Sequence, residues 1–139
     1  MSRKNSRIHG GWIGMLLTIV VISIILFLTL MPSENTMHLS ESFRIWLNDH
    51  GISVSSEQLR SDIHIFEYFP LGFTLCLWIG WKKSIIIGSL LGLADEILKI
   101  YLPTRHFSWI DAAKDAIGVI LGTLAALLII NFISKQKNK

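Results

Sequence analysis

The sequence contains one cysteine, Cys76, and three prolines among 139 residues. A single cysteine excludes an intramolecular disulfide. Because Cys76 lies in the apolar run 71–80, we expect a small packing residue rather than a reactive thiol. Charged residues make up only 17% of the chain against 51% hydrophobic residues, whereas a soluble domain carries about a quarter charged residues. This imbalance, with a mean hydropathy of +0.52, predicts an integral membrane protein.

The basic residues do not form a nucleic-acid-binding surface. The net charge is +3, but the basic side chains lie at the two tails and in one short loop, with no aromatic stripe beside them. Membrane topology accounts for that distribution, so we expect no nucleic acid partner. At this length the chain forms one domain, 1–139.

Four apolar runs are long enough to cross a hydrocarbon core about 30 Å thick at 1.5 Å per helical residue. The first follows Arg3, Lys4 and Arg7 as a signal peptide would, but its length and the absence of a small-x-small cleavage site favour a retained helix that ends at Pro32. The sequence therefore predicts an all-α bundle of four transmembrane helices at about 11–31, 63–81, 84–102 and 109–133.

The segment 33–55 is the longest polar connection. Its apolar residues recur at helical spacing, which fits either a short amphipathic helix on the membrane surface or a loop with scattered apolar residues. These residues are Leu39, Phe43, Trp46 and Leu47. Ser55 and Gln58 then form a capping pattern for the next helix, in which Pro70 predicts a kink.

Orientation follows from the lysines and arginines, which concentrate on the cytoplasmic side. With both termini inside, eight of them are cytoplasmic and five lie on the outer side, which places the loops 33–62 and 103–108 outside. The eight are Arg3, Lys4, Arg7, Lys82, Lys83, Lys135, Lys137 and Lys139, and the five are Arg44, Arg60, Lys99, Arg105 and Lys114.

Ionisable residues within the last three runs are the informative feature. Such side chains are costly in lipid and normally face the protein interior. In the predicted topology all of them fall in the outer half of the membrane, so we expect one polar pocket open to the outside. Small residues on the same faces predict close helix contacts at Gly72, Gly88, Gly92, Gly118 and Gly122. The first helix lacks such a face and is expected to be peripheral.

The stretches 64–72, 95–99 and 105–122 resemble the VanZ-like family of bacterial membrane proteins, over residues 60–122. The resemblance implies a multi-pass protein of the bacterial cytoplasmic membrane and an effect on susceptibility to the glycopeptide antibiotic teicoplanin. It rests on His64, Glu67, Tyr68, Leu71, Gly72, Asp95, Glu96, Arg105, Ser108, Asp111, Gly118 and Gly122.

The chain departs from the family pattern in ways that change charge. Lys99 stands at the usual glutamine position and Asp115 at the usual asparagine position; in addition, Ile65 replaces the aromatic residue after the histidine, and Ser61 stands where a lysine is common. One charge change adds a positive side chain and the other a negative one. We therefore hypothesise that Lys99 and Asp115 form an ion pair.

Three functions remain open for the polar residues. They could only fix helix packing, could bind a lipid or envelope-precursor headgroup with Arg105 as the anion partner, or could catalyse a reaction with Glu67 and His64, and the Asp95–Glu96 pair, as acid–base groups. Ser108 fits a helix cap better than a nucleophile. We expect no metal and no cofactor, because the cluster offers one histidine and no His/Cys set. The candidate pocket residues are His64, Glu67, Tyr68, Asp95, Glu96, Lys99, Arg105, Ser108, Asp111 and Asp115.

Overall fold

A computed structural model describes residues 11–137, apart from the side chains of residues 60 and 61. The basic residues expected at the N-terminal tail, and Lys139, therefore lie outside the described residues. The described chain consists of helices without strands, which confirms the all-α prediction. The helices are α1 (Gly11–Leu30), α2 (Ser33–Asp49), α3 (Ser56–Ile79), α4 (Trp81–Lys99) and α5 (Trp109–Lys137).

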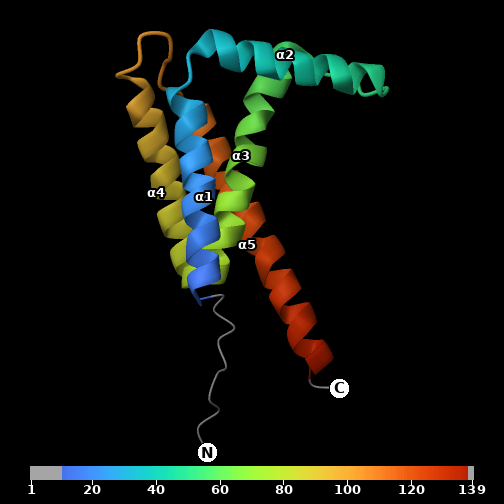
Figure 1. The fold of residues 1–139 in the computed structure, drawn as a ribbon, viewed down its shortest axis with the longest axis vertical. Coiled ribbons are helices and arrows are strands. Elements are labelled where there is room, and N and C mark those ends of the chain that lie inside the picture. Colours follow the sequence, from blue (N-terminus) through green and yellow to red (C-terminus); the bar gives the residue numbers. More distant parts are fainter. Residues whose placement is uncertain (1–10, 138–139) are drawn as a thin grey trace, which may run out of the picture.

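Four of these helices form one bundle, and α2 lies across one end of it (Figure 1). Helix α3 is central, because it packs against α5, α1 and α4. The core lies along α3, where Tyr68, Leu71 and Leu75 meet Val119 of α5 and Ile25 of α1. The single cysteine, Cys76, is buried in the same helix, in keeping with a packing role.

Two of the described helices, α1 and α5, are long and apolar enough to cross a membrane by length and composition. Much of the bundle surface is apolar as well: Phe27 on α1, Leu90 on α4 and Leu128 on α5 are all more than half exposed. In water a monomer rarely exposes apolar surface on this scale. Lipid is the solvent that such a surface fits.

Helix α1 is not peripheral, and the expectation that it would be is wrong. Thr18 and Ile25 are buried against the bundle. A Cβ atom added to Gly14 would lie 3.1 Å from the backbone nitrogen of Trp78 in α3, so the two backbones approach closely there. The small residues Gly14 and Thr18, four positions apart, form this contact face, as small-xxx-small pairs do in membrane helices.

The segment after Pro32 forms the helix α2 and not a loop, so of the two alternatives for this segment the helix is confirmed. Ser40 faces the bundle and is buried, whereas Leu39, Phe43 and Trp46 are exposed along another face. Glu41 accepts hydrogen bonds from Arg44 and, at 3.1 Å, from the Ser56 hydroxyl at the start of α3. The guanidinium of Arg44 lowers the pKa of the Glu41 carboxyl. These polar contacts hold α2 across the end of α3.

The start and end of α3 follow local chemistry. The Ser55 hydroxyl accepts the backbone N–H of Gln58 at 3.2 Å, which confirms the predicted cap. The helix continues through Pro70. It ends at Gly80, whose φ of 83° lies in the region that favours glycine. Gly80 alone separates α3 from α4, so α4 begins three residues earlier than expected and the two helices form a tight hairpin.

Hydroxyl groups join α3, α4 and α5 in the half of the bundle away from α2. The Ser84 hydroxyl of α4 donates to the carbonyl oxygen of Gly72 in α3 at 2.9 Å and lies 2.9 Å from the Thr123 hydroxyl of α5. Ser84 and Thr123 are both fully buried. This contact supplements the glycine packing and was not expected from the sequence.

Candidate functional site

A buried polar cluster lies where α3, α4 and α5 meet at the α2 end of the bundle. Glu96 and Asp115 are 0% exposed, and Asp95 and Lys99 are nearly as well buried. Helical spacing places Asp95 and Lys99 one turn apart on the inner side of α4, and Asp115 reaches the cluster from α5. The structure thus brings together the charged residues of α4 and α5 that were predicted to share a pocket.

The Lys99 ammonium is held by carboxylates of its own helix. It lies 3.4 Å from Oδ2 of Asp95 and also contacts Oε1 of Glu96. The hypothesised Lys99–Asp115 pair is not formed as a close ion pair among the described residues, although the two side chains interact electrostatically at longer range. The reason is local, because Asp95 and Glu96 precede Lys99 by one helical turn and are reached without crossing between helices.

Glu96 and Ser108 join the end of α4 to the start of α5. Oε2 of Glu96 accepts the backbone N–H of Ser108 at 3.1 Å. The Ser108 hydroxyl accepts the backbone N–H of Asp111 at 3.2 Å, which confirms the predicted helix cap. With its hydroxyl used in this way, Ser108 fits a structural role rather than that of a nucleophile.

His64 joins α3 to α5. Its Nδ1 lies 3.1 Å from Oδ1 of Asp115, and its Nε2 lies 3.9 Å from Oδ2 of Asp111. Glu67, half-buried on the same helix, interacts electrostatically with His64 and Asp95. A histidine between two carboxylates can hold or transfer a proton, so the acid–base chemistry considered for His64 and Glu67 remains chemically available.

One buried polar atom of this cluster, Oδ2 of Asp115, has no hydrogen-bond partner among the described residues. The Tyr68 hydroxyl, also buried, has the Asp95 carboxylate as its polar neighbour. Buried polar groups in folded proteins almost always have a partner, so the Asp115 oxygen calls for an explanation. A strained or catalytic position, or a bound water or ion, is the usual one.

Arg105 lies outside this cluster. Its Nη2 donates to the carbonyl oxygens of Leu28 and Met31 at 3.0 and 2.9 Å and to the Thr36 hydroxyl at 3.3 Å. Arg105 therefore satisfies the carbonyls at the end of α1, as basic side chains near helix C-termini do. These contacts differ from the predicted role as the anion partner in the pocket.

Thr29 of α1 is a site residue that the sequence analysis missed. Its hydroxyl donates a hydrogen bond to Oδ1 of Asp95 and is buried. A single threonine in a long apolar run gives no signal of this contact. Lys114, in the fourth apolar run, contacts Asp62 at 2.9 Å, with both side chains partly exposed.

Glycines set the distances between the helices around the cluster. A Cβ added to Gly92 would lie 2.8 Å from the Asp115 Cβ, and one added to Gly118 would lie 2.5 Å from the Ile65 carbonyl oxygen. Equivalent atoms at Gly72 and Gly122 would collide with the backbone of Val119 and Phe69, and one at Gly88 would lie 2.6 Å from the Val119 side chain. Gly72, Gly118 and Gly122 therefore lie at backbone contacts that leave no room for a larger residue, whereas at Gly88 and Gly92 a neighbouring side chain would have to shift.

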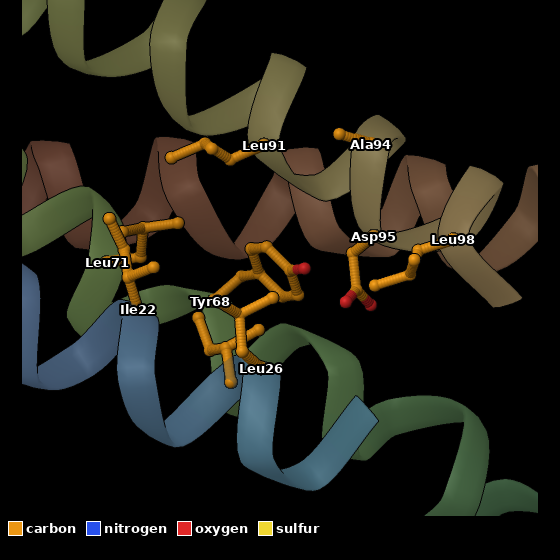
Figure 2. Close-up of a pocket in the computed structure, with 9 residues that line it drawn as sticks. Ile22, Leu26, Tyr68, Leu71, Leu91, Ala94, Asp95 and Leu98 are labelled. Carbon is orange, nitrogen blue, oxygen red and sulfur yellow. The ribbon is translucent and has the colours of Figure 1, made fainter. Parts of the chain in front are cut away.

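A cavity of about 240 Å³ lies between α1, α3 and α4. Figure 2 shows the Tyr68 hydroxyl and the Asp95 carboxylate at one end of the cavity, pointing toward one another. The other lining residues are apolar: Ile22, Ile25, Leu26, Leu71, Leu91, Ala94 and Leu98.

The protein-family comparison covers the fold from α1 to α5. A family model described as VanZ/LLP1 matches residues 12–131. The chain belongs to the VanZ/LLP1 family. No curated protein and no solved structure matched the chain.

Membership of the VanZ/LLP1 family, with the apolar helices α1 and α5, supports a VanZ-like membrane protein. The VanZ/LLP1 match begins within α1 and ends within α5. The matched range therefore includes Thr29, which lies outside the three motif stretches 64–72, 95–99 and 105–122.

Proposed function

We propose that this VanZ/LLP1 protein crosses the bacterial cytoplasmic membrane four times as a single domain, with both termini in the cytoplasm. Helices α1, α3, α4 and α5 lie side by side, and α1 begins, α4 begins and α5 ends at the same end of the bundle (Figure 1). The described lysines of that end, Lys82, Lys83, Lys135 and Lys137, would be cytoplasmic. The buried cluster and α2 would then lie on the outer side.

We further propose that the protein binds an amphipathic membrane molecule, a lipid or an envelope precursor. The cavity between α1 and α4 carries this proposal, because its walls are apolar apart from the Tyr68 hydroxyl and the Asp95 carboxylate, which lie together at one place in the lining. Leu26 and Ala94 of its lining are exposed, so the cavity reaches the bundle surface where lipid chains would lie. An apolar chain fits the walls and a polar group fits the end.

The polar groups at the cavity favour a hydroxyl-rich headgroup. Asp95 faces the cavity but is paired with Lys99 at 3.4 Å, and Arg105 is engaged with the carbonyls of α1 rather than directed into the cavity. The Tyr68 hydroxyl can donate to or accept from a sugar or glycerol hydroxyl. An effect on teicoplanin susceptibility would follow if the bound molecule were an intermediate or a lipid of the cell envelope.

Thermal stability in detergent tests headgroup binding. The lipids to compare are phosphatidylglycerol, phosphatidylethanolamine, a glycosyl diacylglycerol and undecaprenyl phosphate. We expect one of these headgroup classes to raise the melting temperature of the protein more than the others do. Tyr68→Phe should remove that difference, since it deletes only the hydroxyl at the cavity end. Tyr101→Phe is the matched control, because Tyr101 is 79% exposed. Equal stabilisation by all four lipids, or an unchanged response of Tyr68→Phe, would contradict the proposal.

Antibiotic susceptibility tests the envelope role. Cells that express the intact protein should tolerate more teicoplanin than cells without it, and an expression-matched Glu67→Gln variant should lose the difference, because Glu67 lies within electrostatic reach of both His64 and Asp95. Glu57→Gln, on an exposed position of the same helix, is the control. Unchanged susceptibility with the intact protein would remove the resistance function and leave the membrane fold unaffected.

A further inference from the structure

We infer that His64, Glu96 and Asp115 bind a divalent cation that accepts mixed nitrogen and oxygen ligands, such as Mn²⁺ or Zn²⁺. The three residues come from α3, α4 and α5, and one ligand atom of each lies within 4.8 Å of the others. Zinc binds such ligands at about 2.0–2.2 Å, so small side-chain rotations would close the set around one ion. No such site was expected from the sequence, and it does not depend on which lipid the cavity accepts.

The unpartnered oxygen of Asp115 is the second observation for this site. Asp115 is 0% exposed, and its Oδ2 has no hydrogen-bond donor among the described residues. Its other oxygen contacts Nδ1 of His64 at 3.1 Å, and its Cβ lies close to Gly92, so the carboxylate is held in place. A fixed, buried carboxylate oxygen without a donor is costly, and a cation would satisfy it.

The surrounding charge favours a cation. Lys99 is the basic side chain of the cluster, and His64 can add one further positive charge. The carboxylates are more numerous, and this excess of negative charge in a buried place requires protons or a metal ion for balance. The carboxylates that face the cluster are those of Glu67, Asp95, Glu96, Asp111 and Asp115.

Neighbouring groups are arranged as supports for such ligands. Oδ2 of Asp111 lies 3.9 Å from Nε2 of His64, on the side away from the Nδ1 contact with Asp115; this is an ion-pair distance and longer than a hydrogen bond. A carboxylate hydrogen-bonded to the second nitrogen orients a ligating histidine in many metal sites, and Asp111 would take this role after a small approach. The Ser108 N–H likewise holds Oε2 of Glu96 at 3.1 Å, which fixes the orientation of that carboxylate.

Lys99 makes the inference testable in two directions. Its ammonium contacts Glu96, so it competes with a metal ion for that ligand. Lys99→Gln should therefore strengthen metal binding, whereas His64→Ala and Asp115→Asn should weaken it. A cluster with only a packing role predicts no metal binding for any of these variants.

The experiment uses the full chain purified in detergent, stripped with a chelator and titrated with MnCl₂ or ZnCl₂ without added lipid. Calorimetry should show one ion per chain, with at least about tenfold weaker binding in Asp115→Asn and His64→Ala and severalfold tighter binding in Lys99→Gln. His106→Ala, at an exposed histidine, is the control and should bind as the intact protein does.

The outcomes separate this site from headgroup binding. Equal affinity of the intact protein and Asp115→Asn, or no binding by Lys99→Gln at millimolar metal, would overturn the inference. Size-exclusion profiles identify any variant that fails to fold, and Asp115→Asn decides if Lys99→Gln does not fold, since it preserves side-chain volume. Because no lipid is present, failure here leaves the headgroup proposal standing, and the converse also holds.

Discussion

Lys99 illustrates how a single charge is accommodated inside this bundle. Its ammonium contacts Asp95 and Glu96, and both carboxylates have a further donor, the Thr29 hydroxyl for Asp95 and the Ser108 N–H for Glu96. The pairing therefore extends to α1 and to the start of α5. The carboxylates of Asp95 and Glu96, on the same helix, balance the charge of Lys99. The Asp115 carboxylate instead contacts His64.

Replacing Lys99 should destabilise the bundle in a way that depends on Glu96. Lys99→Gln leaves buried carboxylates uncompensated, which costs about 3–5 kcal/mol. Adding Glu96→Gln should recover most of the lost free energy of unfolding, because both charges of the closest pair are then absent. Adding Asp115→Asn instead should recover little. Denaturation in detergent micelles measures each variant, and equal recovery in the two double variants would contradict the observed pairing.

At the scale of elements, the helices follow from hydrophobic pattern and capping chemistry. The apolar runs indicated α1, α4 and α5 to within about four residues, because uninterrupted apolar stretches are local properties of the chain. Helix α3 begins at Ser56, well before its apolar run at 63, and there the serine cap rather than the run indicated the start. Helix α2 could not be decided, since its exposed Leu39, Phe43 and Trp46 fit either a helix or a loop. Its contacts with α3, through Glu41 and Ser56, are not local in sequence.

Gly122→Ala should show how closely α3 and α5 approach. The added methyl group would collide with the carbonyl oxygen of Phe69, a backbone atom that cannot rotate away. We expect a loss of about 1–3 kcal/mol in stability. Leu121→Ala is the control, because this neighbouring side chain is 45% exposed. Melting curves in detergent compare the two, and an unchanged melting temperature for Gly122→Ala would count against the close contact.

At the scale of the whole molecule, the sequence could indicate which residues gather but not how they pair. Membrane depth alone grouped His64, Asp95, Glu96 and Asp115, because charged side chains avoid lipid. Pairing depends on helix rotation and on which backbones touch. For that reason the role of Thr29 and the position of Arg105 against α1 were not predicted.

Cysteine labelling tests the proposed topology. In a Cys76→Ser background, Ser42→Cys on α2 should react with a membrane-impermeant maleimide in intact cells. Lys82→Cys, at the opposite end of the bundle, should react only after permeabilisation, since both positions are exposed and the proposed topology puts them on opposite sides of the membrane. The reverse labelling pattern would show that the orientation is inverted.

Gly80 has a consequence for how the chain reaches the bilayer during synthesis. One residue spans less than about 4 Å, and the Ser84 hydroxyl joins the two helices just beyond the turn through the Gly72 carbonyl oxygen. In the proposed topology α3 and α4 would therefore meet the bilayer as one hairpin. His64 would then enter alongside Asp95 and Glu96 rather than alone, and the insertion machinery would receive the hairpin as a single unit.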